Sequence, residues 1–508
     1  MQPLLLNLDL GTTNCKAVVF TAEGVQVAAI SREHPTYHPR PDWAEQDPAE
    51  WWKAALAVIT EAVSSTRQQG RLVAMTVTSQ REGIVPVGPG CEPLSHCIIW
   101  MDKRTGPQAE ELEKRLGRER VHLLTGLRID PAFSAAKILW IARNQPEAFA
   151  AAEKFLQPGD FLLAKLSGKY VTDQSISSRT MLMNVRERKW EPELLEAVGL
   201  TASRMPDLVA PGTPIGPVLA VIAQVTGLPS DCLVCAGAGD QQAGALGAGA
   251  ISQDIVACSI GTASVIAVTT PQPILDDSQT MICGCSAIPG KWLLEPALWT
   301  TGSVLRWFRD ELACPEVSEA RLRGVDPYEV ITELAASVPP GAEGVKVIPH
   351  FMGAGSPHWV PEARGVIFGL SLGHTRAHLA RAIMEGVAFE LVANLELARK
   401  LGIRPREVRM LGGGAYSPLW RQILASAAGL PVALPGTAEA VSLGGAILGA
   451  TAAGLYGAVE EAAAAMGKVQ ETTQPDPAQQ AVYKREFAVY MDLMRTLTPA
   501  FIKAFRNQ

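Results

Sequence analysis

The sequence predicts an α/β protein built from two related halves, and three observations lead to this prediction. Strand-like and helix-like segments alternate along the chain, and runs of strands precede the alternation in each half. The 508 residues are more than one hydrophobic core usually accommodates, so two large domains are expected. A short glycine turn between two apolar runs occurs once in each half. Together these features favour two α/β layers over a single barrel.

The repeated turn is the most informative local pattern. Residues 9–13 read Asp-Leu-Gly-Thr-Thr, and residues 259–263 read Ser-Ile-Gly-Thr-Ala. A strand, a tight glycine turn and a second strand leave backbone N–H groups free at the tip, and such groups bind anions. Two such tips predict one nucleotide held in a cleft between two domains. Only the first copy, with Asp9 where the second has Ser259, can bring a carboxylate to a metal.

In the first half, the expected elements begin with an antiparallel set of strands at residues 4–8, 17–20 and 25–30. A helix follows over residues 48–62, with Asp47 as a plausible N-cap. Further strands are expected at residues 72–78, 98–100 and 233–236, with alanine-rich helices between the second and third of these.

The second half repeats the scheme. It is expected to contain hairpins over residues 255–298, helices over 303–336, a long helix near 375–401 and a strand at 408–411. The last ~35 residues are expected to be helical and to pack back on the body. The break between the halves falls near residues 246–252, which gives predicted domains 1–249 and 250–508.

Charge and composition argue against two classes of partner, nucleic acid and membrane. The net charge of -6 and pI near 5.9, without a dense basic cluster, argue against nucleic acid. Residues 440–459 carry no charge but are mostly glycine and alanine, which favours a buried helix over a membrane span. The first apolar run is interrupted by Asn7 and Asp9, so it is interpreted as a buried strand and not as a signal peptide.

The nine cysteines lack regular spacing, which predicts a reducing compartment and hence a cytoplasmic protein. Cys232 and Cys235 have zinc-like spacing, but they fall within a predicted buried strand and no second pair lies at a suitable distance. They are therefore interpreted as small buried hydrophobic residues. A homodimer is an arrangement that the sequence leaves open.

Asp240 is the candidate general base. It follows the small-residue strand end Gly237-Ala238-Gly239, where a helix is expected to begin. A carboxylate in this position is fixed by the scaffold and faces a cleft. The alternative is that Asp240 only caps the helix.

Two further groups of polar residues follow predicted strands. Residues 79–82 read Ser-Gln-Arg-Glu, and the adjacent Arg81 and Glu82 could donate to and accept from neighbouring hydroxyls of a polyol. The alternative is a surface ion pair. Residues 100–104, which contain Asp102, have the same two interpretations.

A glycine turn, Gly412-Gly413-Gly414, follows the last predicted strand of the second half and precedes a helix. Glycines here would let the backbone approach a flat base or a phosphate. A triple glycine is weak evidence by itself, but it gains weight beside the two glycine tips. No Walker-type loop is present, so a nucleotide would be held differently than in P-loop enzymes.

Taken together and in their order along the chain, the motifs of this sequence resemble those of one family, the FGGY carbohydrate kinases of the actin/hexokinase/Hsp70 ATPase superfamily. The resemblance spans essentially the whole chain. Its motifs are Asp9 to Thr13 with Lys16, Trp43 to Pro48, Trp100 to Arg104, Gly237 to Gln241, Ser259 to Thr262, Pro361 to Gly365, Glu385-Gly386, Gly412 to Gly414 and Glu439 to Ala446. It implies two ribonuclease H-like (actin-like ATPase) domains with the active site in the cleft between them.

The resemblance also implies roles for individual residues, with ATP and Mg²⁺ as cofactors. Asp240 matches the catalytic base, and Asp9 matches the carboxylate near the magnesium ion. The cofactor-binding positions that it implies are Gly11, Thr12, Thr13 and Lys16 in the first half and Gly261, Thr262, Gly413 and Gly414 in the second. The substrate-binding positions are Gln80, Arg81, Glu82, Asp102, Asp240 and Gln241.

Three stretches are similar to glycerol kinases: residues 79–82, 178–182 and 239–243. Glycerol kinases, however, have tyrosine in the motif Asp-Pro-Tyr-Phe-Ser, where this chain has Ala132 within residues 130–134. Alanine removes a polyol contact and leaves room for a longer substrate.

Other stretches resemble other members. Residues 43–52 are similar to xylulose kinases, although those usually have Met-His at positions 81–82. Residues 81–85, 306–310 and 338–341 resemble kinases of the autoinducer-2 ketone. The expected substrate is a polyhydroxy compound of four to six carbons, phosphorylated at a terminal hydroxyl. A ketopentose such as xylulose is the first choice, and glycerol, erythritol, gluconate and the autoinducer-2 ketone are alternatives.

A hypothesis of another class is a non-catalytic, nucleotide-switched binding protein, because the superfamily also contains actin-like and chaperone members. Asp240 discriminates between the two, since a non-catalytic relative has no need of a carboxylate there. Arg81 and Glu82 also favour a small hydroxylated ligand.

Overall fold

The computed structural model describes residues 1–505, so the last three residues of the predicted terminal helix lie outside the described residues. The chain forms two compact units. The first comprises Met1–Ile251, Thr269–Leu294 and Glu439–Lys468, and the second comprises Ser252–Val268, Glu295–Ala438 and Val469–Gln508. The domain boundary drawn at residue 249 stays a prediction, because two later segments also belong to the first unit.

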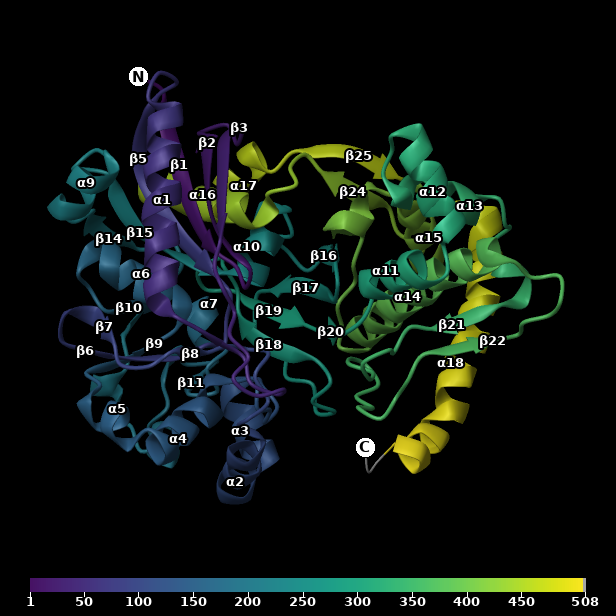
Figure 1. The fold of residues 1–508 in the computed structure, drawn as a ribbon, viewed down its shortest axis with the longest axis horizontal. Helices are drawn as coiled ribbons and strands as arrows, with labels where there is room; N and C mark the ends of the chain where they lie inside the picture. The colour runs from purple at the N-terminus through teal and green to yellow at the C-terminus, as the bar shows by residue number, and fades with distance from the viewer. Residues whose placement is uncertain (506–508) are drawn as a thin grey trace. The chain divides into compact units, whose positions relative to one another are not determined.

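The first unit is organised around a six-stranded sheet in the order β14-β15-β5-β1-β2-β3 (Figure 1). Strands β15, β5 and β1 are parallel, while β1, β2 and β3 form the antiparallel set that the sequence predicts. Its strands are β1 (Pro3–Leu10), β2 (Asn14–Thr21), β3 (Gln26–Glu33), β5 (Arg71–Ser79), β14 (Pro214–Pro217) and β15 (Leu233–Gly239).

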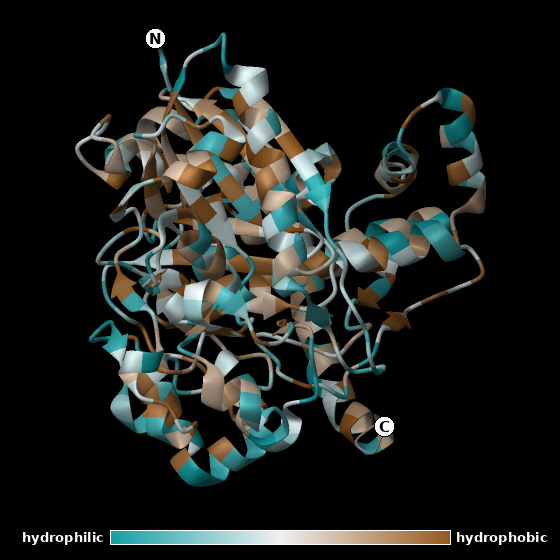
Figure 2. Cartoon of the chain, turned by 60° about the vertical axis from the view of Figure 1, so that its left-hand side comes forward, coloured by the Kyte–Doolittle hydropathy of each residue, from teal (hydrophilic) through white to brown (hydrophobic). Residues whose placement is uncertain are grey.

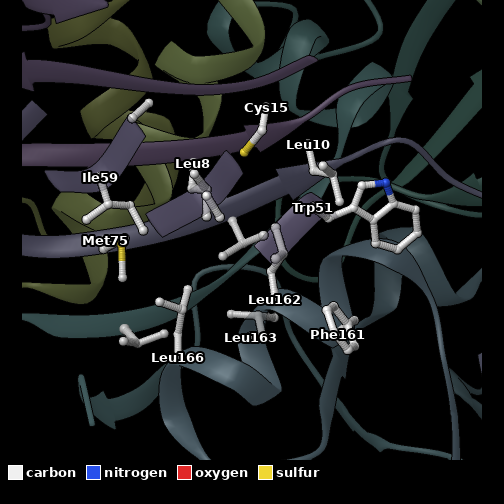
Figure 3. Packing of buried hydrophobic residues seen from close by; sticks show 14 of the residues in the cluster. Leu8, Leu10, Cys15, Trp51, Ile59, Met75, Phe161, Leu162, Leu163 and Leu166 are labelled. Carbon is white, nitrogen blue, oxygen red and sulfur yellow. The ribbon is translucent and has the colours of Figure 1, made fainter. Parts of the chain in front are cut away.

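Both faces of β1 are buried, as expected of a strand covered by helices on each side. Leu4, Leu6, Leu8 and Leu10 pack with helices α1 (Pro48–Thr66) and α6 (Pro158–Ser167) in one core. Figure 3 shows Leu8 and Leu10 on the sheet side and Leu162, Leu163 and Leu166 on the helix side of this core. Leu5, which points the other way, belongs to a second core with α16 (Ala440–Ala452).

Helix α1 shows why the local sequence forms this element. Asp47 is its N-cap, as predicted, and its side chain accepts a hydrogen bond from the N–H of Ala49. Pro48 occupies the first turn, where its missing N–H costs nothing. Trp51, on the buried face, packs edge-on against Phe161 with ring centroids 6.3 Å apart.

Helix α16 crosses α10 (Asp240–Gly247) at very short range. A Cβ added at Gly444 would lie 2.0 Å from the carbonyl oxygen of Ala243, and one at Gly247 would lie 1.9 Å from that of Ala440. The uncharged, glycine-rich segment is therefore a buried helix packed on backbone, as predicted. Among residues 1–505, no helix is both long enough and apolar enough to span a membrane.

Shorter elements complete the first unit. Most of its remaining helices pack around a third core that includes Phe133, Trp140 and Phe155. The helices are α2 (Gly106–Leu116), α3 (Arg118–Thr125), α4 (Ser134–Asn144), α5 (Pro146–Ala151), α7 (Gln174–Ser177), α8 (Pro192–Ala197), α9 (Ala220–Thr226) and α17 (Val459–Met466). The short strands are β4 (Glu45–Gln46), β6 (Val85–Gly88), β7 (Glu92–Pro93), β8 (Cys97–Ile98), β9 (Lys154–Leu156), β10 (Val171–Asp173), β11 (Met183–Asn184), β12 (Lys189–Trp190), β13 (Asp207–Val209), β18 (Ile282–Cys285) and β19 (Trp292–Glu295).

The predicted strand over residues 98–100 is shorter than expected and lies earlier. Strand β8 consists of Cys97 and Ile98, paired with Gln46 and Glu45. Trp100 lies beyond its end in a turn and is 43% exposed.

The second unit repeats the mixed arrangement, with strands ordered β17-β16-β23-β24-β25 and β20 paired to β17. Strands β16, β23 and β24 are parallel, and β17 and β25 are antiparallel to their neighbours. The strands of the unit are β16 (Ile255–Ile260), β17 (Ser264–Thr270), β20 (Ala297–Leu298), β21 (Lys346–Ile348), β22 (Val366–Phe368), β23 (Glu407–Leu411), β24 (Val432–Pro435) and β25 (Val469–Thr473). Its helices are α11 (Gly302–Glu311), α12 (Cys314–Arg323), α13 (Pro327–Ala336), α14 (Arg376–Lys400), α15 (Pro418–Ala428) and α18 (Pro477–Phe505).

The terminal helix α18 packs back on its unit, as predicted. Figure 2 shows hydrophobic and hydrophilic residues interleaved along it near the C terminus. Tyr483 and Tyr490 are fully buried, and both pack against Phe389 of α14. Phe501 joins a small core with Val360.

Candidate active site

The first glycine tip joins β1 to β2 in the first unit. The N–H of Gly11 donates to the carbonyl of Asn14 at 2.9 Å, which closes the turn. Within residues 1–505, the backbone N–H groups of Thr12 and Thr13 donate no hydrogen bond. They are available to an anion, as the sequence predicts.

The second tip, in the second unit, is built the same way. Three residues, 261–263, connect β16 to β17, and the N–H of Gly261 donates to the carbonyl of Ala263 at 3.1 Å. In the described part of the chain, the N–H of Thr262 also has no acceptor. The two turns are thus structural copies, which accounts for the sequence repeat.

The glycine turn lies beside this second tip. Strands β16 and β23 are parallel with Ser259 opposite Leu411, so the turn after β23 and the tip after β16 share one sheet edge. Gly412 has φ of 76°, and a Cβ there would lie 2.6 Å from the carbonyl oxygen of Ile260. Gly413 is exposed, and a Cβ added to it would meet no atom within 4 Å, so its backbone is open to a ligand.

A cavity of about 420 Å³ lies in the second unit. It is lined by side chains that include Arg381, Leu419, Gln422 and Gln479. Neither Gly413 nor Gly414 lines it, so the cavity is not by itself evidence for a nucleotide site.

Parallel pairing also gathers polar residues in the first unit. Ser79 lies opposite both Leu10 of β1 and Gly239 of β15, so the carboxyl ends of three parallel strands coincide. Asp9, Arg81 and Asp240 are therefore brought to one edge from positions far apart in the sequence.

Arg81 is held between Asp240 and Gln242. Its Nε lies 3.3 Å from Oδ1 of Asp240, and its Nη1 donates to Oε1 of Gln242 at 3.1 Å. The Arg81 side chain is 9% exposed and that of Asp240 28%, so the carboxylate remains reachable. A Cβ at Gly239 would lie 2.6 Å from Cδ of Arg81, which explains the glycine before Asp240.

Asp240 is the first residue of α10, and Gly239 is the N-cap residue. The carboxylate accepts a hydrogen bond from the N–H of Gln241 at 2.7 Å. This local contact does not exclude the functional interpretation, because the same oxygen faces Arg81. Gln241, predicted to bind substrate, lies half-buried beside it.

Glu82 is buried in a strained backbone conformation, with φ of 65°. Arg179 donates to its carboxylate at 2.7 Å, and Lys137 and Ser134 donate to its carbonyl oxygen at 2.8 and 3.1 Å. Burial alone would raise the pKa of Glu82, but Arg81 and Arg179 outweigh it and lower the pKa. Strain held by many partners is typical of binding and catalytic positions.

Asp9 has an unusual ionisation. Burial raises its pKa to about 7; a hydrogen bond from Thr78 at 2.8 Å opposes this shift, and the charge of Asp240 adds to it. Strands β1 and β15 both pair with β5 at Ser79, so Asp9 and Asp240 come to the same edge of the sheet. Such a pair is suited to a cation, which would favour the ionised form of both.

Three other predicted residues have partners of their own. Lys16 pairs with Glu439, with Nζ 2.8 Å from Oε2. Gln80 is buried and donates to Gln46 at 2.8 Å, below the first tip. Asp102 is fully buried and binds Arg104 at 2.7 Å, so its role in substrate binding stays a prediction.

Several residues of this site were not predicted from the sequence. Trp100 lies in the stretch 100–104 that the sequence singled out, but its contact was not predicted: its Nε1 donates to the hydroxyl of Thr12 at 3.0 Å. Arg179, Lys137 and Gln242 act through contacts with Glu82 and Arg81.

The two cysteines with zinc-like spacing are not part of the site. Cys232 and Cys235 are buried and free, as predicted. Burial raises the pKa of each thiol to about 12, so both remain protonated small hydrophobic side chains at neutral pH.

Comparison with known families gives two matches that together cover most of the chain. Residues 4–247 match the N-terminal domain, and residues 256–453 the C-terminal domain, of the FGGY family of carbohydrate kinases. The chain belongs to this family. It is a carbohydrate kinase, and the non-catalytic alternative is not supported.

The curated relatives of this FGGY kinase are named for three different substrates. The gluconokinase of Bacillus subtilis is 30% identical over 98% of this chain and 96% of its own length. The xylulose kinase of Escherichia coli is 31% identical over 84% and 85%. The glycerol kinase of Alkalilimnicola ehrlichii is 33% identical over 91% and 92%.

Solved structures agree. The gluconate kinase of Lactobacillus acidophilus superposes with a TM-score of 0.91 at 25% identity, over 99% of this FGGY kinase and 100% of that chain. The predicted α/β fold with two actin-like ATPase domains is thereby confirmed. Kinases of this family use ATP as phosphoryl donor and act on small sugars or polyols.

Proposed function

We propose that this FGGY kinase transfers the terminal phosphoryl group of Mg-ATP to a terminal hydroxyl of a small polyhydroxy compound, with Asp240 as general base. The observation that carries the proposal is the placement of Asp240. Its partly exposed carboxylate is oriented by Arg81 at the sheet edge that also carries Asp9. Phosphoryl transfer depends chiefly on positioning and charge neutralisation, so a fixed base and a cation ligand are the groups required.

The remaining residues have assigned roles in this proposal. The open N–H groups of Thr12, Thr13 and Thr262 would hold phosphate oxygens, and the backbone at Gly413 and Gly414 would face the adenosine. Asp9 would hold Mg²⁺, whose charge neutralises the phosphates when it is bound. Lys16 is a further phosphate partner only if it exchanges Glu439 for the nucleotide.

The acceptor is proposed to be a ketopentose such as xylulose. Arg81 and Glu82 would bind neighbouring hydroxyls. Lys137 donates to the backbone carbonyls of both Glu82 and Ala132, at 2.8 and 2.5 Å, so one side chain joins these two backbone segments. Alanine in place of the tyrosine of glycerol kinases would suit an acceptor longer than glycerol.

Gluconate is the second candidate. The Bacillus subtilis gluconokinase covers nearly the whole chain, and the Lactobacillus acidophilus gluconate kinase has the same fold throughout. The same base and cation ligand would serve this six-carbon acid.

The proposal is tested by ADP release from Mg-ATP with xylulose, ribulose, gluconate, glycerol, erythritol and the autoinducer-2 ketone. One acceptor is expected to dominate. Asp240→Asn should lower kcat by a factor of about 10² to 10⁴ while ATP affinity is retained. Full activity in this variant would refute Asp240 as the base, and a dominant acceptor other than a ketopentose would refute only the substrate assignment.

We further propose a cytoplasmic location, since all nine cysteines are free and eight of them are buried.

A further inference from the structure

A cluster of two histidines and a glutamate lies in the second unit, among residues that the proposed kinase chemistry does not use. His350 and His358 belong to the segment between β21 and β22, and Glu390 lies in the middle of α14. Glu390 is fully buried, and the His350 and His358 side chains are 5% and 14% exposed. A buried charged group of this kind needs partners that satisfy it.

The distances in the cluster are those between ligands of one ion. Nε2 of His350 lies 3.2 Å from Oε1 of Glu390, and Nε2 of His358 lies 3.3 Å from the same oxygen. Two ligand atoms that each lie about 2.0–2.1 Å from a tetrahedral zinc ion are about 3.3 Å apart. The three ligand atoms all fall within 4.8 Å of one another.

The directions in the cluster do not suit hydrogen bonds. Despite these short separations, Nε2 of each histidine is buried without a hydrogen-bond partner among residues 1–505, and so is Oε2 of Glu390. Unsatisfied buried polar atoms are rare in folded proteins and indicate a missing partner. The two unsatisfied Nε2 atoms both lie beside one carboxylate, which indicates a partner that they share.

Tyr490 supplies the outer contact that metal-bound carboxylates usually have. Its hydroxyl, on α18, donates to Oε1 of Glu390 at 2.6 Å and fixes the carboxylate.

We propose that His350, His358 and Glu390 bind one divalent transition-metal ion, with Zn²⁺ the ion that suits imidazole and carboxylate ligands. The ion joins the segment after β21 to α14 and, through Tyr490, to α18. Three protein ligands leave one position of a tetrahedral ion for water. The site is separate from the Mg²⁺ proposed at Asp9, and its role is to stabilise the second unit.

A second histidine cluster in the same unit provides an internal contrast. Nδ1 of His374 accepts from the N–H of Ser371 at 2.8 Å, and Nδ1 of His378 accepts from that of Thr375 at 3.1 Å. Each neutral ring therefore carries its proton on Nε2, where His378 contacts Glu343 at 3.1 Å. These rings are satisfied as they stand, so this cluster is not proposed as a metal site.

The test measures zinc on the whole protein. The protein is treated with a chelator, dialysed against Zn²⁺ and analysed for bound metal, and affinity is measured by competition with a chromophoric chelator. We expect one zinc ion per chain and a higher Tm with Zn²⁺ than without. His358→Gln should weaken binding by more than about a hundredfold and Tyr490→Phe by about 10–100-fold.

His378→Gln is the matched control and should bind zinc as the parent does. Co²⁺ in place of Zn²⁺ should give visible absorption of a tetrahedral site that His358→Gln loses. Because Glu390 is fully buried and its replacement could unfold the protein, the partly exposed His358 carries the test. Absence of stoichiometric zinc, or unchanged affinity in His358→Gln, would overturn the proposal and leave the three residues as an ion-pair cluster.

Discussion

At the scale of single residues, the ionisation of Asp9 predicts a pH profile. Burial raises the pKa of Asp9 to about 7, so the carboxyl is protonated below this pH and cannot bind a cation. Metal ligands must be deprotonated, and metal binding releases the proton. We therefore expect kcat/KM at low Mg²⁺ to fall by about tenfold per pH unit below pH 7 and to level off above it.

The Mg²⁺ dependence identifies the group responsible. In the proposed site Mg²⁺ competes with the proton for Asp9, so raising the Mg²⁺ concentration should move the acid limb to lower pH. A second readout is direct: the Kd for Mg-ATP, measured by calorimetry, should be weaker at pH 6 than at pH 8. An acid limb that does not respond to Mg²⁺ would assign the titration to another group.

At the scale of secondary-structure elements, the contact of α10 with α16 determines where Asp240 lies. A Cβ at Gly444 would lie 2.0 Å from the carbonyl oxygen of Ala243, and backbone cannot yield as a flexible side chain can. Gly444→Ala should therefore destabilise the protein by about 1–3 kcal/mol or more, and kcat should fall because α10 carries Asp240, the proposed base. Gly449→Ala is the control, since its nearest neighbour is the Thr76 methyl at 3.3 Å. It should cost less than about 1 kcal/mol, because alanine also favours the helix. The free energy of unfolding is measured by chemical denaturation, and kcat by steady-state kinetics, for both variants. Equal losses of stability and of kcat in the two variants would contradict the role assigned to this contact.

The elements also show what sequence reasoning could and could not predict. The glycine tips at Gly11 and Gly261 were predictable, because a strand-turn-strand motif is encoded by adjacent residues. The roles of Arg179 and Gln242 were not, because they depend on pairing with Glu82 and Arg81, which lie 97 and 161 residues away in the chain.

The same limit applies to Trp100. The β-type run before it suggested a strand, but the pairing with Glu45 and Gln46 stops at Ile98. Pairing partners distant in sequence therefore decide where such a run ends.

At the scale of the whole molecule, the proposed tasks fall on different parts of the two units. The first unit carries Asp240, Arg81 and Ala132, which bear on the acceptor, as well as the first glycine tip and Asp9, which bear on Mg-ATP. The second carries the tip at Gly261 and the open turn at Gly413. A substitution at an acceptor residue or at the glycine turn should therefore change the kinetics of one substrate only.

Two variants test this division. A Cβ added at Gly413 meets no protein atom within 4 Å, so Gly413→Val should leave Tm unchanged. Because the adenosine is proposed to approach this turn, the variant should raise the KM for ATP and leave the KM for the acceptor unchanged. Gly106→Val, at an equally open glycine of the first unit, is the control and should change neither KM. In the opposite sense, Ala132→Tyr introduces the tyrosine of the glycerol kinase motif on the segment that Lys137 joins to Glu82. It should raise the KM for a ketopentose by about tenfold or more, improve the relative use of glycerol and leave the KM for ATP unchanged. If Gly413→Val raised the acceptor KM, or Ala132→Tyr the ATP KM, the two positions would not act on separate substrates, and the assignment of adenosine to the glycine turn would have to be abandoned.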